Sequence, residues 1–184
     1  CKQILLEEKA SMESGLVDSG HRVVSMRIAS MYSQSDYLGE LFGGISQLQF
    51  VRSLLENFDQ QWEKIQQNLQ LLEKHIVTID NLLCNLTCER SQWAAVKDAA
   101  TCITDSLTSR SQAKKEWTLH RPITHEILVA PTAVNYVGKG SNLYTSDYTY
   151  HGSHAVITRY LRTTWLWEQV RVKGGAYGGF CSLD

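Results

Sequence analysis

The sequence has almost no net charge and no long apolar run. It contains 18 lysines and arginines against 19 aspartates and glutamates, which gives a net charge of −1 at pH 7. Binding to nucleic acid or to an anionic membrane surface usually requires an excess of positive charge, so we expect neither partner. No uninterrupted apolar stretch approaches the ~20 residues that a membrane-spanning helix needs. With 43% hydrophobic and 20% charged residues, the composition instead predicts a globular chain.

The sequence also lacks the motifs of common catalytic centres. Its six histidines form no HExxH or HxxEH arrangement, which would place two imidazoles and a carboxylate on one helical face. There is no GxSxG motif, and no cysteine has a histidine partner nearby in the sequence. Residues 138–141 form a glycine-rich turn without the GxxxxGK[ST] spacing of a phosphate-binding loop. We therefore predict no metal site within this chain.

The five cysteines form no CxxC pair, and their odd number leaves at least one without a partner. Cys84 and Cys88 are four residues apart in a stretch that we expect to be a strand, where they would be too distant to bridge. We predict free thiols. The chain begins at Cys1 and stops at Asp184, directly after a glycine-rich segment with no closing turn or cap. We expect it to be a piece of a longer protein, so the lack of a targeting segment predicts nothing about localisation.

The first 115 residues predict several helices and one strand. Apolar residues recur at steps of three and four residues, typical of helices, over 2–33, 46–55, 59–75 and 89–107. Ser46 is a plausible N-cap, and Arg27, which lies mostly off the apolar face of its helix, is interpreted as a solvated charge. Residues 79–87 are apolar and β-favouring and predict a strand, so this region resembles the closing unit of an α+β sandwich domain. The polar, unpatterned stretch 108–115 predicts a linker, which places a domain boundary near residue 115.

Residues 116–184 predict the start of a second α+β domain. Two stretches, 126–137 and 143–150, favour strands, and Ser153 can cap a helix over 154–169. The helix leads to Arg171, then to a Gly174-Gly175 hinge, and then to Tyr177 between two glycine pairs.

This glycine-flanked tyrosine is the most informative feature of the sequence. Four glycines in the six positions 174–179 predict a bare turn and strand edge along which a peptide could lie. Reversal of the chain at Gly174-Gly175 would bring the Arg171 guanidinium and the Tyr177 phenol to one place. A fixed cation beside a neutral hydroxyl donor suits recognition of a carbonyl or an oxyanion. The simpler alternative is a helix C-cap followed by a core strand, with Arg171 solvated in the last turn.

Two long stretches carry a family resemblance. Residues 131–139, Pro-Thr-Ala-Val-Asn-Tyr-Val-Gly-Lys, and residues 164–181, which include Arg171 and Tyr177, resemble the C-terminal half of the presequence proteases. These enzymes are the branch of the pitrilysin and insulinase metallopeptidases that includes falcilysin. Residues 43–52 and 83–87 are similar to the end of the preceding domain in the same proteins.

The resemblance implies a clamshell enzyme of four related domains that closes around an unfolded peptide. Residues 1–115 would end the third domain and 116–184 would begin the fourth, each part of a pitrilysin-like two-layer α/β sandwich. An N-terminal half, absent from this chain, would bind zinc through an inverted HxxEH motif. Arg171 and Tyr177 map onto the family's substrate-contacting Arg and Tyr, with Gly174 and Gly175 beside them.

The resemblance also implies a function for the complete protein. It would degrade targeting presequences and other short unstructured peptides in the mitochondrial matrix or a plastid, whereas the piece alone is not expected to cleave anything. The alternative is a non-catalytic structural member of the superfamily, comparable to the core subunits of respiratory complexes. The missing zinc motif supports that alternative, but truncation explains the missing motif equally well.

Overall fold

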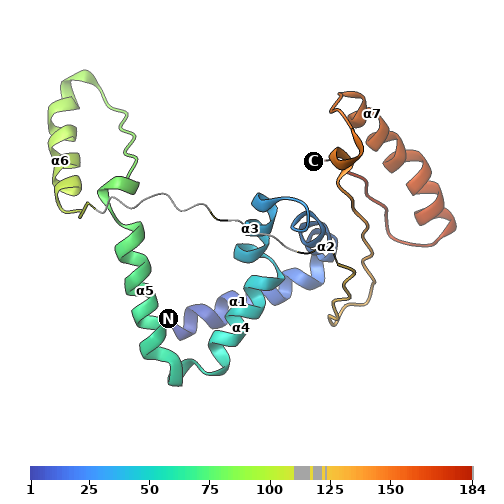
Figure 1. Ribbon diagram of the computed structural model, residues 1–184, viewed down its shortest axis with the longest axis horizontal. Coiled ribbons are helices and arrows are strands. Elements are labelled where there is room, and N and C mark those ends of the chain that lie inside the picture. The colour runs from blue at the N-terminus through green and yellow to red at the C-terminus, as the bar shows by residue number, and fades with distance from the viewer. Residues whose placement is uncertain (110–116, 118–121, 123, 184) are drawn as a thin grey trace. The chain divides into compact units, whose positions relative to one another are not determined.

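The computed structural model describes residues 1–109, 117, 122 and 124–183 (Figure 1). It divides into two compact units, Cys1–Gly140 and Ser141–Asp184. The predicted domain boundary near residue 115 and most of the predicted linker lie outside the described residues. None of the helices in the described part is long and apolar enough to cross a membrane.

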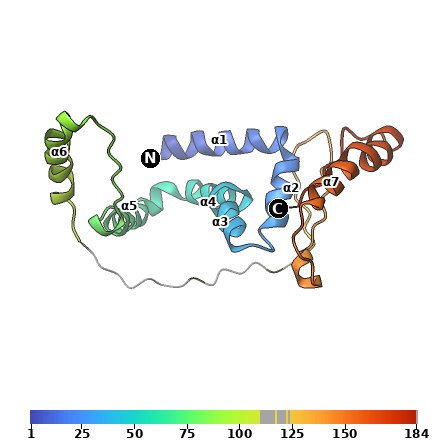
Figure 2. The ribbon, with the colours of Figure 1, turned by 90° about the horizontal axis from the view of Figure 1, so that it is seen from above.

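The first unit is built from helices. In chain order these are α1 (Lys2–Asp18), α2 (Gly20–Ala29), α3 (Gln34–Gly43), α4 (Ile45–Glu56), α5 (Phe58–Ile76) and α6 (Trp93–Asp105). Helix α4 packs on both α1 and α3, and Figure 2 shows α1 running alongside α4. The best-buried apolar side chains are Leu48 and Val51 of α4 and Phe58 of α5.

The helix boundaries agree only in part with the sequence predictions. The predicted break at Gly43-Gly44 is confirmed, because α3 ends at Gly43 and α4 begins at Ile45. A side chain at Gly44 would put its Cβ 2.7 Å from the Glu40 carbonyl oxygen, so a larger residue does not fit this close turn. Ser46 is not the N-cap of α4; Gly44 occupies that position. Helix α3 was not predicted, and it begins with the Ser33 hydroxyl accepting a hydrogen bond from the Asp36 amide.

The three predicted strands are wrong, and the described residues contain no strand. Residues 79–81 form a 3-10 turn followed by unpaired extended chain, 126–137 are irregular, and 143–146 form another 3-10 turn. A strand requires a partner for its backbone hydrogen bonds, and none lies alongside these segments in the described structure. Their apolar side chains remain exposed, as Leu83 at 92% and Val129 at 97% show. The described fold is therefore helical rather than an α+β sandwich.

The second unit contains one long helical segment. It begins as α7 (Ser153–Tyr160) and continues as two π-helical stretches, Leu161–Trp165 and Trp167–Lys173. The predicted helix is confirmed, but Gly152 rather than Ser153 is its N-cap. The hydroxyls of Thr163 and Thr164 donate to the carbonyls of Arg159 and Tyr160, which an α-helix would pair with backbone amides. This competition favours the wider π-helical winding.

All five cysteines are free, as the sequence predicted.

Candidate functional site

The π-helix ends in a tight reversal at the glycine pair. The Gly175 amide donates to the Arg171 carbonyl and the Ala176 amide to the Val170 carbonyl, each at 3.1 Å. Gly175 has a φ of +69°, the left-handed conformation that glycine adopts most readily. A Cβ on Gly174 would lie 2.6 Å from the Val170 carbonyl oxygen. Glycine at 174 and 175 thus allows the chain to turn back directly after Arg171.

This reversal brings the two predicted site residues together. The guanidinium carbon of Arg171 lies 5.8 Å from the centre of the Tyr177 ring and 4.3 Å from the centre of the Trp167 ring. Both distances are within the range of cation–π attraction. Tyr177 is 91% exposed, so its phenol is open to a ligand. The glycine hinge in the sequence predicted this proximity, whereas the contact with Trp167 was not predicted.

The charges around the reversal distinguish Arg171 from its basic neighbour. Lys173 Nζ lies 2.9 Å from a carboxylate oxygen of Glu168, five residues earlier, a spacing that π-helical winding places on one face. No carboxylate in the described part of the chain pairs with Arg171. Arg171 is therefore a cation with no carboxylate partner among the described residues, and it lies beside the exposed phenol of Tyr177.

The glycines after Tyr177 do not form the predicted strand edge. A Cβ on Gly179 would lie 3.1 Å from Leu166 Cβ, so the chain returns closely against its own helix. Beyond it, the ring of Phe180 lies 5.5 Å from the Arg162 guanidinium carbon. The segment is thus held on the helix by packing rather than by a sheet.

A second cluster of charges, in the first unit, was not found from the sequence. Glu40 is only 1% exposed, and it accepts hydrogen bonds from Arg27, from the Ser46 hydroxyl and from the Ser46 amide, at 2.7, 2.6 and 3.0 Å. Arg27 also donates hydrogen bonds to the Glu126 carboxylate, from Nε at 2.7 Å and from Nη2 at 3.3 Å. The interpretation of Arg27 as a solvated charge is wrong, because its side chain is 15% exposed.

The electrostatics of this cluster favour its charged form. Burial by itself would raise the pKa of Glu40, but the hydrogen bonds from Ser46 and Arg27 outweigh it and hold that pKa below its ordinary value. Burial would likewise lower the pKa of Arg27, whereas its bonds to Glu126 and Glu40 raise it above its ordinary value. Glu126 follows Arg27 by 99 residues, so helical periodicity carried no signal for this pair.

The first unit also contains a cavity of about 220 Å³, with Glu40 in its wall. Its lining is otherwise largely apolar and includes Leu16, Val23, Met26 and Leu48. None of the predicted site residues lines it.

No group of three histidine, cysteine, aspartate or glutamate side chains in the described structure is arranged to hold a metal ion. The described residues therefore do not provide the ligand set that zinc requires.

Comparison with known sequences gives two family matches. Residues 1–54 match the family described as Peptidase M16-C associated, and residues 125–184 match the PreP C-terminal domain. The first match contains Arg27 and Glu40, whereas the second contains Glu126, Arg171 and Tyr177.

Three relatives extend the similarity over nearly the whole chain. Presequence protease 1, chloroplastic/mitochondrial, of Arabidopsis thaliana is 35% identical over 184 residues, covering 100% of this chain and 17% of the relative. Protein HypA of Clostridium perfringens is 28% identical over 183 residues, covering 98% of this chain and 18% of the relative. Presequence protease, mitochondrial, of Xenopus laevis is 24% identical over 206 residues, covering 94% of this chain and 20% of the relative.

The chain thus spans no more than a fifth of the length of these relatives. The first of these matches names the M16-C peptidases, and the second names PreP. Together with the 35% identity to the Arabidopsis relative over the whole chain, these matches support the presequence protease branch and confirm the resemblance found in the sequence.

Proposed function

We propose that this chain is part of a zinc metalloendopeptidase that degrades targeting presequences and other short unstructured peptides. In this proposal the chain supplies side chains that bind the peptide and stabilise the developing oxyanion. The observation that carries the proposal is the proximity of Arg171 and Tyr177, which meet at the Gly174-Gly175 reversal with the phenol exposed.

The proposed chemistry of Tyr177 follows from its hydroxyl. The phenol O–H donates a hydrogen bond to the carbonyl oxygen of the scissile peptide, and this bond strengthens as negative charge develops on that oxygen. A neutral donor suits this role because it interacts more strongly with the oxyanion than with the ground-state carbonyl.

Arg171 has a different part in the same site. Its guanidinium presents several N–H donors in a planar fork. It anchors the peptide substrate, or supports the phenol through its contact with the Tyr177 ring. Stacking on Trp167 limits the freedom of the guanidinium before the peptide arrives.

Zinc belongs to this proposal as a cofactor bound elsewhere in the complete polypeptide. Its ligands, an inverted HxxEH motif, would come from an N-terminal half, which is the second partner of this chain besides the peptide. In that complete protein, residues 1–115 and 116–184 are parts of two adjacent pitrilysin-like α+β sandwich domains. The relatives named chloroplastic and mitochondrial support a location in the mitochondrial matrix or a plastid.

The test is hydrolysis of a fluorescent presequence peptide by the complete polypeptide. We expect cleavage that a zinc chelator abolishes and added zinc restores, and we expect no cleavage by the 184-residue chain alone. If the complete, folded, zinc-supplied polypeptide cleaves no unstructured peptide, the protein is a non-catalytic member of the superfamily and the proposal fails.

A further inference from the structure

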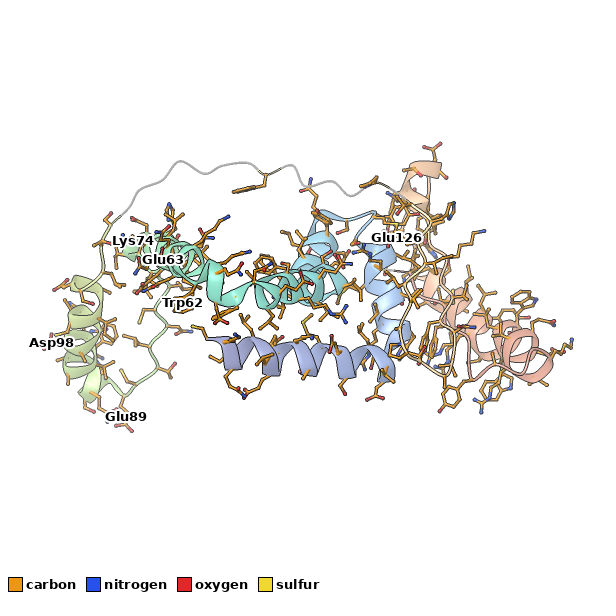
Figure 3. The ribbon with its side chains drawn as sticks, turned by 90° about the horizontal axis from the view of Figure 1, so that it is seen from below. Trp62, Glu63, Lys74, Glu89, Asp98 and Glu126 are labelled. Carbon is orange, nitrogen blue, oxygen red and sulfur yellow. The ribbon has the colours of Figure 1, made fainter. Side chains whose placement is uncertain are left out.

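Residues 126–140 lie against helix α2, which belongs to a different family match. Glu126 lies beside α2 in Figure 3 and accepts two hydrogen bonds from one edge of the Arg27 guanidinium. Such a two-point contact between arginine and a carboxylate fixes direction as well as distance. It is also partly shielded, because the Arg27 and Glu126 side chains are 15% and 26% exposed.

Glycines shape the rest of this contact from both sides. Gly20 of α2 leaves room for the Tyr136 ring, since a Cβ there would lie 2.3 Å from a ring carbon. In turn, a Cβ on Gly138 would lie 2.3 Å from Val24 Cγ1, and one on Gly140 would lie 2.3 Å from Ile28 Cγ2. Three glycines therefore permit close approach of the backbone on one side to the side chains on the other.

The far end of the contact is closed by a further hydrogen bond. The Tyr32 hydroxyl, just beyond α2, donates to the Gly140 carbonyl at 2.9 Å. The alternate residues 136, 138 and 140 thus contact successive turns of the chain from Gly20 to Tyr32. The contact is therefore a continuous docked segment and not one isolated ion pair.

The hydrogen bonds of Arg27 are divided between two carboxylates. Arg27 Nη1 bonds Glu40 and Ser46, while Nε and Nη2 bond Glu126. If Glu126 moves away, the buried Glu40 keeps both Arg27 and Ser46 as partners. Opening therefore does not leave a buried charge unpaired, which would be the costly outcome.

We propose that α2 is the docking surface for residues 126–140, and that Glu126 is a releasable ionic latch on Arg27. The latch fastens the beginning of the PreP C-terminal match to the helices of the peptidase-associated match. This inference goes beyond the proposed peptidase function and does not depend on it.

Disulfide trapping tests the docking directly. The Cβ built on Gly138 lies 3.7 Å from Val24 Cβ, and that on Gly140 lies 3.8 Å from Ile28 Cβ, both at the ~3.8 Å separation usual for disulfides. In the 184-residue chain with its five native cysteines replaced by serine, we expect the pair Val24→Cys/Gly138→Cys to cross-link in oxidised glutathione. The pair Ile28→Cys/Gly140→Cys is an independent second arm, because each substitution removes the side-chain branch that would clash.

A matched control and a latch variant complete the experiment. Val24→Cys/Gly39→Cys should not cross-link, since nothing lies within 4 Å of a Cβ on Gly39. Glu126→Gln should slow both expected cross-links about tenfold by removing the charge-assisted contact. Glu13→Gln, which breaks the exposed Arg52–Glu13 pair at 2.7 Å, should leave their rates unchanged.

Two results would overturn the proposal. If neither pair cross-links faster than the Gly39 control while circular dichroism shows intact helices, residues 126–140 do not dock on α2. If the pairs cross-link but Glu126→Gln has no larger effect than Glu13→Gln, Glu126 is not a latch. Both readouts are independent of peptide hydrolysis, so a failure here is distinct from a failure of the proposed activity.

Discussion

The guanidinium of Arg171 lies 5.8 Å from the centre of the Tyr177 ring, across the Gly174-Gly175 reversal that directly follows the helix end at Lys173. A cation at this distance attracts the electron-rich ring and limits where the exposed phenol can point. This attraction favours one arrangement of the two side chains, which under the proposed function would reduce the entropy lost when a peptide binds.

Replacing Arg171 should weaken substrate binding in the complete polypeptide. Arg171→Gln is expected to lower kcat/KM for an unstructured peptide by about 10- to 100-fold, as for loss of a hydrogen bond from a charged group. Lys173→Gln is the control, since Lys173 already pairs with Glu168 in an exposed position and its loss should change kcat/KM by about twofold or less. Equal effects of the two substitutions would refute a specific role for Arg171.

Gly175 should tolerate alanine poorly. Its φ of +69° is strained for any residue with a Cβ, so Gly175→Ala is expected to reduce the free energy of unfolding by about 1 kcal/mol. Gly152→Ala is the matched control, because Gly152 is right-handed helical with nothing within 4 Å of an added Cβ. Urea unfolding of both variants measures the difference. A Gly175→Ala chain as stable as the Gly152→Ala chain would contradict the reversal described here.

The buried Glu40 should make stability depend on pH. Because its pKa in the folded chain lies below the ordinary 4.5, the charged form is favoured by folding. This contribution is fully present above pH 4.5 and is lost as the pH falls through the lowered pKa of the folded state. The free energy of unfolding of the unmodified chain should therefore fall with acidification in that window.

Glu40→Gln isolates that contribution. At pH 7 it should destabilise the chain by on the order of 3 kcal/mol, since one partner of a buried ion pair is removed. The variant should also lose part of the acid dependence. Glu13→Gln, at an exposed pair, should cost less than about 1 kcal/mol and leave the acid dependence intact. An acid profile that is the same for the unmodified chain and Glu40→Gln would contradict the charged, hydrogen-bonded state of Glu40.

The helices that could be predicted from sequence are those with sustained periodicity. Helices α4, α5 and α6 repeat apolar residues at helical spacing, so their existence followed from pattern alone. Helix α3 was missed because it is only 10 residues long and contains Gly39. The predicted strands failed for a different reason. A β-favouring composition forms a strand only where a partner strand is present, and the described residues supply none.

The site shows the same division between local and distant information. Arg171 and Tyr177 are six residues apart, so a glycine hinge was enough to predict that they meet. The π-helical winding that also places Trp167 under Arg171 depends on threonine hydroxyls that compete for helix carbonyls, which a simple periodicity does not reveal. Arg27 and Glu126 are brought together by tertiary folding across 99 residues, and no local pattern records that contact.

The most direct test of the proposed function is the kinetics of Tyr177→Phe in the complete polypeptide. The substitution removes one hydroxyl and keeps the ring that Arg171 contacts. If Tyr177 stabilises the oxyanion, kcat for a presequence peptide should fall by about 10²- to 10³-fold while the dissociation constant of the peptide changes little. If kcat is unchanged, the phenol takes no part in the reaction and the central claim is wrong.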